Sequence, residues 1–563
     1  MGESVAILGG GVAGLSAAHE LAERGFEVRV YERNSLFGGK ARSLLKAGSG
    51  TGGRRDLPGE HGFRFFPGFY RHVIDTMRRI PYGASSNVFE NLTAATRILL
   101  ARAGRQDTFW VARVPDTVAD FRVFLGELFT NLGVPAQETA YFVERILVIA
   151  TSCQRRREEE YEKIAFWDFI GAAERSVAYQ KYLAEGLTRS LVAMRAEESS
   201  TRTVGPILLQ LLYPLAFPGE SFDRLLTGPT NDVWIFPWID HLRKLGVQLR
   251  LDVKVEQFLM SGGRIGGVEL ATAAGTETIT ADYYVAAMPV EVMAPLVSSQ
   301  MKSAAPSIAN LDQLKVEWMN GIQFYLDREE PLCNGHVIYL DSPWALTSIS
   351  QRQFWRAGLE DRGNGNCRDI LSVDVSDWNT PGILYGKPAA ECTPEEIRTE
   401  VWQQIAASVP LNVTPGGLEV VDWFLDPDIS FPNPSQAANL EPLLINTVNS
   451  FQYRPQAQTE IPNLFLASDY VRTNTNLATM EGANEAARRA TNAILDASHS
   501  SAPKAAVFQF EDPAIFRPAQ DLDAVLYSTG HPHVGTTPGA ESIWASLTGL
   551  GYHAPPTARQ IPG

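Results

Sequence analysis

The chain has little cysteine and no excess of positive charge. Its 563 residues include four cysteines, widely spaced and without a CxxC pair. Such spacing gives no sign of a disulfide framework or a metal site and suits a reducing compartment. The formal net charge of −15 argues against a nucleic-acid partner, because phosphate binding needs clustered Lys and Arg. We therefore expect a cytoplasmic protein that holds no metal and binds no nucleic acid.

Long hydrophobic runs are also missing. The most apolar stretch, "VGPILLQLLYPLAFP" (204–218), is interrupted by three prolines and is shorter than the roughly 20 residues that a membrane span requires. We interpret it as core or as a wall of a substrate domain, with peripheral contact to a membrane as the alternative. The strand-like run from Ser4 has no charged segment before it, so no signal peptide is expected.

The first thirty residues have the pattern of a βαβ unit around a glycine-rich loop. Residues 4–8 predict a buried strand, residues 13–24 a helix and residues 26–32 a second strand. A dinucleotide diphosphate would lie at this helix N-terminus, and an acidic residue ending the second strand would accept the ribose hydroxyls. The predicted contacts are Gly9, Gly11, Val12, Ala13, Gly14 and Glu32.

The segment "FGGKARS" follows the acidic residue and favours FAD over a nicotinamide cofactor. A glycine pair lets the loop lie against an extended cofactor, and a cation there balances diphosphate charge. The predicted contacts in and before this segment are Arg33, Gly38, Gly39, Lys40, Ala41 and Arg42.

The pattern GxGxxG…E…GG(R/K)xR resembles the flavin amine oxidase and phytoene desaturase superfamily, which includes hydroxysqualene dehydroxylases. Three further segments look most like plant and cyanobacterial 15-cis-phytoene desaturases: "HGFRFFPGFYRHVIDTMRRI", "LTGPTNDVWIFPWIDHLRKLGVQLRLDVKVEQF" and "IPNLFLASDYVRTNTNLATMEGANEAARRA". The resemblance covers residues 4–80 and 225–495 well. It implies FAD as cofactor and adds flavin contacts at His61, Gly62, Phe63, Arg64, Val255, Asp469, Met480 and Ala483.

Three positions depart from the pattern of the family. Ser468 replaces the usual Gly before the flavin-binding Asp, a small change that should leave FAD binding intact. Asp232-Val233 stands where plant-type desaturases carry an active-site Arg, which argues against phytoene and the plant-type electron acceptor. Asn320 stands near the place of a Lys common in amine oxidases, which weakens that reading.

The expected fold class is α/β, with a Rossmann-type FAD-binding domain and a discontinuous mixed α+β substrate-binding domain that carries a helical insertion. Residues from about 70 to 230 predict long amphipathic helices, and the last part of the chain is expected to be an extended arm without chemistry. The predicted domains are 1–80, 230–300 and 455–500 for FAD, 81–229 and 301–454 for substrate, and 501–563 for a C-terminal extension.

The resemblance implies an FAD-dependent oxidoreductase that oxidises or desaturates a hydrophobic, isoprenoid substrate by hydride transfer to flavin N5. The alternatives are a hydroxysqualene dehydroxylase-type reduction, an amine oxidase, and a flavin-dependent isomerase or binding module without net redox chemistry. The electron acceptor (quinone, oxygen or another flavoprotein) and the oligomeric state stay open.

Three polar residues are candidates for catalysis. His61 could accept a proton or bond the flavin, or it could only hold its loop. Arg64 could stabilise negative charge on the reduced flavin, or it could pair with a carboxylate such as Glu60. Glu481 could act in the active site, or it could sit in the first turn of its helix for dipole reasons alone.

Overall fold

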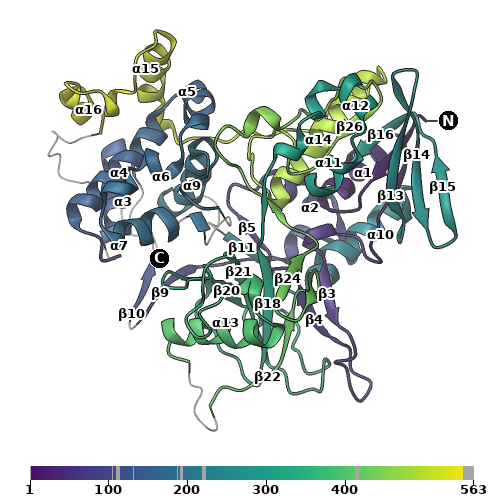
Figure 1. The fold of residues 1–563 in the computed structure, drawn as a ribbon, viewed down its shortest axis with the longest axis horizontal. Coiled ribbons are helices and arrows are strands. Elements are labelled where there is room, and N and C mark those ends of the chain that lie inside the picture. The colour runs from purple at the N-terminus through teal and green to yellow at the C-terminus, as the bar shows by residue number, and fades with distance from the viewer. Residues whose placement is uncertain are drawn as a thin grey trace.

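The computed structural model describes residues 2–548, apart from residues 104, 110–114, 131, 187, 190–193, 218–222 and 412–416. Residues 549–563 of the predicted C-terminal extension lie outside the described residues. Figure 1 shows a helix-covered parallel sheet at the right, a larger sheet with one long helix below it, and a group of helices at the left.

The first sheet is entirely parallel. Its central strand is a continuous buried apolar run, as expected where helices cover both faces of a sheet. The predicted strand–loop–helix–strand unit is confirmed, and distant segments supply the other strands. In spatial order the strands are β12 (Gln248–Arg250), β2 (Glu27–Tyr31), β1 (Ser4–Leu8), β16 (Tyr283–Ala286) and β26 (Leu464–Leu466).

Two long helices pack together beside this sheet, α1 (Val12–Ala22) and α14 (Met480–Ala497). Close packing of α1 on the loop before it requires glycine, because a Cβ on Gly14 would lie 1.9 Å from the carbonyl oxygen of Gly9. Further helices around the sheet are α2 (His72–Arg79), α10 (Phe236–Lys244), α11 (Val290–Leu296) and α12 (Ser299–Ala304). An antiparallel sheet of β13 (Lys254–Ser261), β14 (Arg264–Thr272) and β15 (Gly275–Ile279) projects from it.

The second sheet has seven strands and is antiparallel except for one pair, β9 with β19. Every residue of two neighbouring strands, β21 (Asp369–Val375) and β18 (Asn320–Leu326), is buried. Helix α13 (Pro394–Ser408) packs against its outer strands and begins with a capping box between Thr393 and Glu396. The strand order is β10 (Arg105–Phe109), β9 (Arg97–Arg102), β19 (Gly335–Tyr339), β20 (Thr347–Ser350), β21 (Asp369–Val375), β18 (Asn320–Leu326) and β22 (Val420–Leu425).

Short strands connect these bodies. One three-stranded sheet joins β5 (Phe65–Pro67), β11 (Asp223–Leu226) and β8 (Leu92–Ala94). The two-stranded pairs are β3 (Ser43–Lys46) with β4 (Leu57–Glu60), β6 (Pro81–Tyr82) with β7 (Ser86–Asn87), β17 (Val316–Glu317) with β25 (Leu443–Leu444), and β23 (Ile429–Asn433) with β24 (Gln436–Asn439).

The helical region is shorter than the sequence pattern predicts. Strands β6 to β10 lie within residues 81–109, and β9 joins the seven-stranded sheet through a parallel pairing with β19, more than two hundred residues later in the chain. The helical prediction is wrong there because this distant pairing decides the local structure. The helices are α3 (Val118–Thr130), α4 (Ala136–Thr151), α5 (Gln154–Glu159), α6 (Phe166–Phe169), α7 (Val177–Tyr179) and α9 (Thr201–Ala216).

The expected extended arm at the C-terminus is only partly correct. Beyond residue 513, helices α15 (Arg517–Ser528) and α16 (Glu541–Thr548) pack on the helical body. Asp523 is buried there and forms an ion pair with Arg156 of α5 at 2.9 Å. A buried carboxylate requires such a partner, and this pair gives the arm a fixed place.

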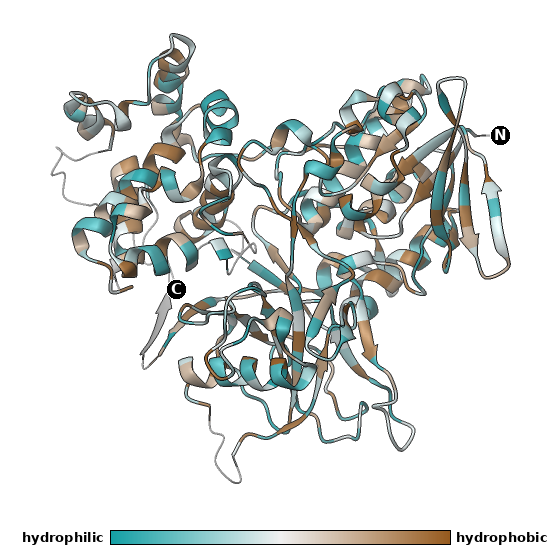
Figure 2. Cartoon of the chain, viewed as in Figure 1, coloured by the Kyte–Doolittle hydropathy of each residue, from teal (hydrophilic) through white to brown (hydrophobic). Residues whose placement is uncertain are grey.

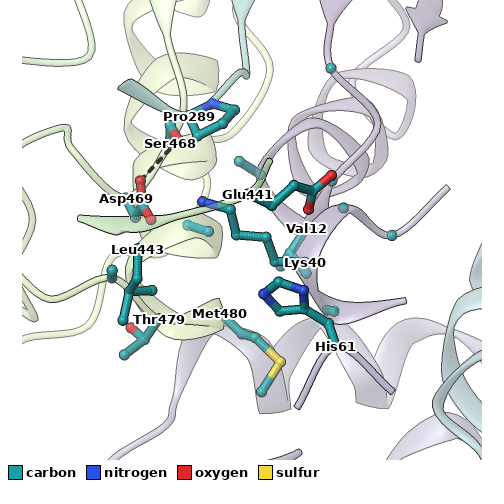
Figure 3. Close-up of a pocket in the computed structure, with 18 of the residues that line it drawn as sticks. Val12, Lys40, His61, Pro289, Glu441, Leu443, Ser468, Asp469, Thr479 and Met480 are labelled. Carbon is teal, nitrogen blue, oxygen red and sulfur yellow. Dashed lines mark hydrogen bonds between the residues drawn. The ribbon is translucent and has the colours of Figure 1, made fainter. Parts of the chain in front are cut away.

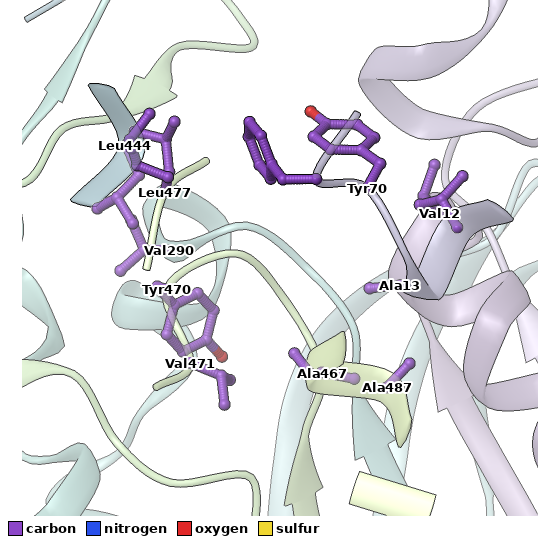
Figure 4. Packing of buried hydrophobic residues seen from close by; sticks show 14 of the residues in the cluster. Val12, Ala13, Tyr70, Val290, Leu444, Ala467, Tyr470, Val471, Leu477 and Ala487 are labelled. Atoms are coloured by element: carbon purple, nitrogen blue, oxygen red, sulfur yellow. The ribbon is translucent and has the colours of Figure 1, made fainter. Parts of the chain in front are cut away.

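Apolar side chains connect the parallel sheet to its surroundings. Figure 4 shows Tyr70 beside Val12, and Leu477 beside Val290, within one buried cluster. In Figure 2 the helices of the left-hand group carry both brown and teal segments, as expected for amphipathic helices. Within the described ranges, the structure has no helix with both the length and the apolar character that crossing a bilayer requires.

Candidate functional site

A cavity lies where the glycine-rich loop, the N-terminus of α14 and the seven-stranded sheet meet. Most residues that the sequence assigns to the cofactor line it, although they come from segments far apart in the chain. Figure 3 shows Lys40, His61 and Met480 around this space. The predicted residues that line the cavity are Gly9, Gly11, Val12, Ala13, Glu32, Arg33, Gly38, Gly39, Lys40, Ala41, His61, Gly62, Phe63, Arg64, Val255, Asp469, Met480 and Ala483.

The N-terminus of α1 is the anion-binding end of the cavity. The N-cap residue is Gly11, and no side chain caps the first turn, so its N–H groups can donate hydrogen bonds to a diphosphate. Glu32, at the end of β2, accepts hydrogen bonds from the N–H groups of Gly10 (2.7 Å) and Asn34 (2.8 Å). Burial raises the pKa of this carboxyl, although the two hydrogen bonds act to lower it. The carboxylate is thereby held where a ribose would lie.

The two predicted phosphate cations have different positions. Lys40 lines the cavity and forms an ion pair with Glu291 of α11 at 3.1 Å. Arg42 is buried behind the lining and pairs with Asp428 (2.9 Å) and Glu441 (3.2 Å). Two carboxylates thus neutralise its buried guanidinium, and the predicted contact of Arg42 with the cofactor stays a prediction. Gly14 likewise lies behind the lining, where it allows the close packing of α1.

The N-terminus of α14 forms the opposite end. Thr479 is the N-cap and accepts a hydrogen bond from the Gly482 N–H at 3.0 Å, while Met480 and Ala483 face the cavity. Asp469 follows β26 and also lines the cavity, with its carboxylate bonded by the Ser468 hydroxyl at 3.2 Å. Serine in place of glycine thus supports the neighbouring Asp.

Glu481, the third catalytic candidate, does not reach this cavity. Its Oε1 accepts hydrogen bonds from the N–H groups of Arg71 (2.7 Å) and His72 (2.8 Å), and Oε2 from Val73 (3.0 Å). The Nδ1 of His72 lies 2.7 Å from the same Oε1. Glu481 therefore caps the first turn of α2, and these contacts favour the structural alternative over a catalytic role.

His61 lines the cavity and carries a buried partner behind it. Its Nδ1 lies 2.7 Å from Asp426 Oδ2. Burial alone would lower the pKa of His61, but Asp426 outweighs burial, and the pKa is raised to about 9. The ring therefore already holds both protons at neutral pH, which favours a donor or a positive charge beside the cofactor over a proton acceptor.

The carboxylates behind His61 are themselves engaged. Asp426 accepts a hydrogen bond from the Asn320 amide at 2.6 Å, and Asp428 pairs with Arg42. His61, Asp426 and Asp428 are close enough to share a cation, but these donors already satisfy the two acids. Asn320 itself lies behind the cavity, so the place near that of the amine-oxidase Lys is filled by a neutral amide that supports Asp426.

Arg64 lines the cavity, and bonds to backbone carbonyl oxygens hold its side chain in place. Its guanidinium donates to the carbonyl oxygens of Lys40, Ala41 (3.4 Å) and Phe63 (3.3 Å). Burial lowers its pKa, against the attraction of nearby carboxylates that include Glu60. Among the described residues no carboxylate forms an ion pair with Arg64, and Glu60 attracts its charge only through space.

Asp374 is a cavity residue that the sequence reasoning missed. It lies on β21 beside Gly62, and its Oδ1 accepts a long hydrogen bond from the Phe63 N–H at 3.3 Å. Burial raises the pKa of this carboxyl to about 7, although Arg64 acts to lower it. The signal was present in "DILSVDVS", because an acid inside a buried apolar strand needs a reason.

The remainder of the wall is apolar and comes from separate elements. Ile207 and Leu211 of α9 lie in it, so the wall interpretation of the 204–218 stretch holds for the residues described. Apolar residues of this wall include Phe65, Pro67, Phe69, Tyr70, Ile207, Leu211, Val292, Met319 and Leu443. A polar end for a diphosphate and an apolar end for a ring or chain thus share one cavity, and these residues fit FAD with a hydrophobic substrate.

Two family models match the chain. "NAD(P)-binding Rossmann-like domain" matches residues 7–80, and "Flavin containing amine oxidoreductase" matches residues 237–495. Among solved structures, cyclohexylamine oxidase from Brevibacterium oxydans has a TM-score of 0.58 at 13% identity, covering 89% of this chain and 100% of its own. Putrescine oxidase bound to putrescine has a TM-score of 0.57 at 12% identity, covering 88% and 99%. These likenesses show a flavin amine oxidase fold.

Similar sequences narrow the assignment. The zeta-carotene desaturase of Zea mays is 36% identical over 526 residues, covering 88% of this chain and 83% of its own. That of Synechocystis is 24% identical over 527 residues, covering 87% and 97%. The 15-cis-phytoene desaturase of Synechococcus elongatus is 23% identical over 516 residues, covering 87% and 95%. The chain belongs to the flavin-containing amine oxidoreductases and, within them, to the group of the carotenoid desaturases.

This membership confirms several predictions. The protein is an FAD-dependent oxidoreductase of α/β fold, and the predicted resemblance is correct. The individual cofactor contacts remain predictions, supported by their convergence on one cavity.

Proposed function

We propose that the enzyme desaturates a long hydrophobic isoprenoid of the carotenoid type, with a hydride passing from a substrate carbon to flavin N5. The observation that carries this proposal is the single cavity in which the FAD-binding residues continue into an apolar wall. An unactivated hydrocarbon offers little for a protein to polarise, so placement by shape should dominate. When bound, FAD supplies the two-electron acceptor.

Asp374 would take the proton from the carbon next to the one that loses the hydride, leaving a new C=C bond between them. Its pKa of about 7 suits a base near neutral pH, and it lies on the cavity wall next to Arg64. His61 and Arg64 would place positive charge beside the cofactor and favour its reduced, anionic form. The electron acceptor that reoxidises the cofactor would be a quinone or oxygen.

Product mass tests the proposal directly. The FAD-loaded enzyme is incubated without oxygen with 15-cis-phytoene or zeta-carotene, the compounds named for its relatives, and a soluble quinone. The expected product is lighter by two hydrogens, with one quinone reduced for each new double bond. An unchanged mass would indicate isomerisation, loss of a hydroxyl from an isoprenoid alcohol would indicate the reductive alternative, and both would contradict desaturation. In a parallel assay in air with an amine as substrate, formation of hydrogen peroxide would contradict the substrate class.

A further inference from the structure

A second cavity, the arginine cavity, is lined by residues of α5, α9 and α14 and of the segments before and after α14. Its volume is about 590 Å³, and it shares no lining residue with the cofactor cavity. Four arginines line it, Arg157, Arg202, Arg472 and Arg489, against two carboxylates, Glu158 and Asp512. This local excess of positive charge contrasts with the net charge of −15 for the whole chain.

Two of the four arginines have their charge neutralised inside the protein. Arg157 pairs with Asp512 at 2.7 Å, and Arg489 pairs with Glu485 at 2.7 Å. Arg202 and Arg472 differ, because among the described residues no carboxylate forms an ion pair with either of them. Their guanidinium groups instead bond backbone carbonyl oxygens, that of Glu158 for Arg202 (2.8 Å) and that of Arg454 for Arg472 (2.6 Å).

Both unpaired guanidinium groups are held against one aromatic ring. Arg202 Cζ lies 3.2 Å, and Arg472 Cζ 4.7 Å, from the centre of the Phe451 ring. Burial lowers the pKa of both groups, and for Arg202 the nearby charge of Arg472 lowers it further. Glu158 and Glu162 attract Arg202 only through space, and Glu162 already accepts bonds from the Phe451 N–H and the Ser200 hydroxyl.

The lining around the two charges is polar. The segment of residues 473–476 contributes two threonines and two asparagines, and the cavity has a volume within the range of small-molecule sites. Two like charges that lie against one ring without an ion-pair partner repel each other, and a planar guanidinium matches phosphate oxygens in a bidentate manner. We propose that the arginine cavity binds the phosphate group of an anionic ligand between Arg202 and Arg472. The source is a soluble phosphate ester or a lipid headgroup.

The test measures phosphate binding to the holoenzyme, so that the diphosphate site of FAD is already filled. Calorimetry with inorganic pyrophosphate and glycerol 3-phosphate is compared for the wild type, Arg202→Gln, Arg472→Gln and the double variant. We expect each substitution to raise Kd about tenfold, since each removes a charge-assisted pair, and added salt to weaken binding. Arg243→Gln, an exposed arginine on α10, is the matched control and should bind like the wild type.

Flotation separates the two sources. Phosphatidylcholine vesicles with phosphatidylglycerol should carry the wild type, but not the double variant, if the ligand is a headgroup; binding of the soluble phosphates alone assigns a free phosphate ester. A wild type that binds neither probe, or a double variant that binds like the wild type, would overturn the proposal. If the double variant fails to load FAD, Arg202→Lys with Arg472→Lys decides the matter: weakened binding supports the site, and an unchanged Kd contradicts it.

Discussion

Two histidines of the segment "GEHGFRFFPGFYRH" each lie 2.7 Å from a buried carboxylate, His61 from Asp426 and His72 from Glu481. The difference is in the second ring nitrogen. Nε2 of His72 accepts the Phe508 N–H at 2.8 Å, so its Nδ1–H donates to Glu481 and the tautomer is locked. Among the described residues no hydrogen bond to Nε2 of His61 is found, and the ring lines the cavity. The same kind of histidine–carboxylate pair is therefore structural at His72, whereas at His61 the ring can contact a ligand in the cavity.

The comparison distinguishes His61 and its neighbour Asp374, which line the cavity, from His72 and Glu481, which are packed inside the protein. The largest effect on activity is expected on the cavity side. Asp374→Asn should lower kcat about 10²- to 10⁴-fold, because the amide cannot accept the proton, while FAD content and Tm stay near those of the wild type. Steady-state kinetics with the visible flavin spectrum checks this. An active Asp374→Asn enzyme would remove the assigned base.

Substitution of Glu481 should lower the stability of the fold. Glu481→Ala leaves three N–H groups at the start of α2 and the ring of His72 without their acceptor, and should lower the free energy of unfolding by about 3 kcal/mol. Glu511→Ala is the control, because its pair with Arg71 is exposed and should contribute less than about 1 kcal/mol. Thermal and urea unfolding of both variants measures the difference. Equal losses would mean that Glu481 is no more than a surface charge.

Cofactor binding should depend on the other end of the cavity. Glu32→Ala should raise the Kd of FAD about ten- to a hundredfold, since it removes an acceptor for the ribose hydroxyls. Flavin fluorescence on titrating the apoprotein gives this value. Glu27→Ala, on an exposed position of the same strand, should leave the Kd unchanged. An unchanged FAD affinity in Glu32→Ala would contradict the ribose contact.

The smallest effect is a shift in pH dependence. Activity should rise through about pH 7 as Asp374 ionises and fall through about pH 9 as His61 loses its proton. Because the folded-state pKa of His61 is raised above the ordinary 6.5, the stability from its pair with Asp426 is complete below 6.5 and lost as pH rises through about 9. His61→Gln should abolish the upper limb and flatten Tm across that window. If the limb persists, another group titrates there.

The local sequence pattern was sufficient to predict the elements that form the cofactor-binding ends of the cavity. The strand, loop and helix of residues 4–22 follow from a short apolar run, three spaced glycines and helical periodicity, all within one segment. The helical pattern of residues 479–496 corresponds to α14, Met480–Ala497. Local pattern failed for residues 97–109, which read as helical and form β9 and β10, because the pairing of β9 with β19 lies outside any local window.

The sequence by itself determined the class of the protein, because a diphosphate, a ribose and a flavin each need particular residues at short spacing. It also named the segment beside the cofactor. Only the tertiary structure decided roles within that segment, since the partners come from more than three hundred residues away: Asp426 and Asp374 beside His61, and Glu481 beside His72. The charge and pKa of a buried group depend on such neighbours, and spacing along the chain does not contain them.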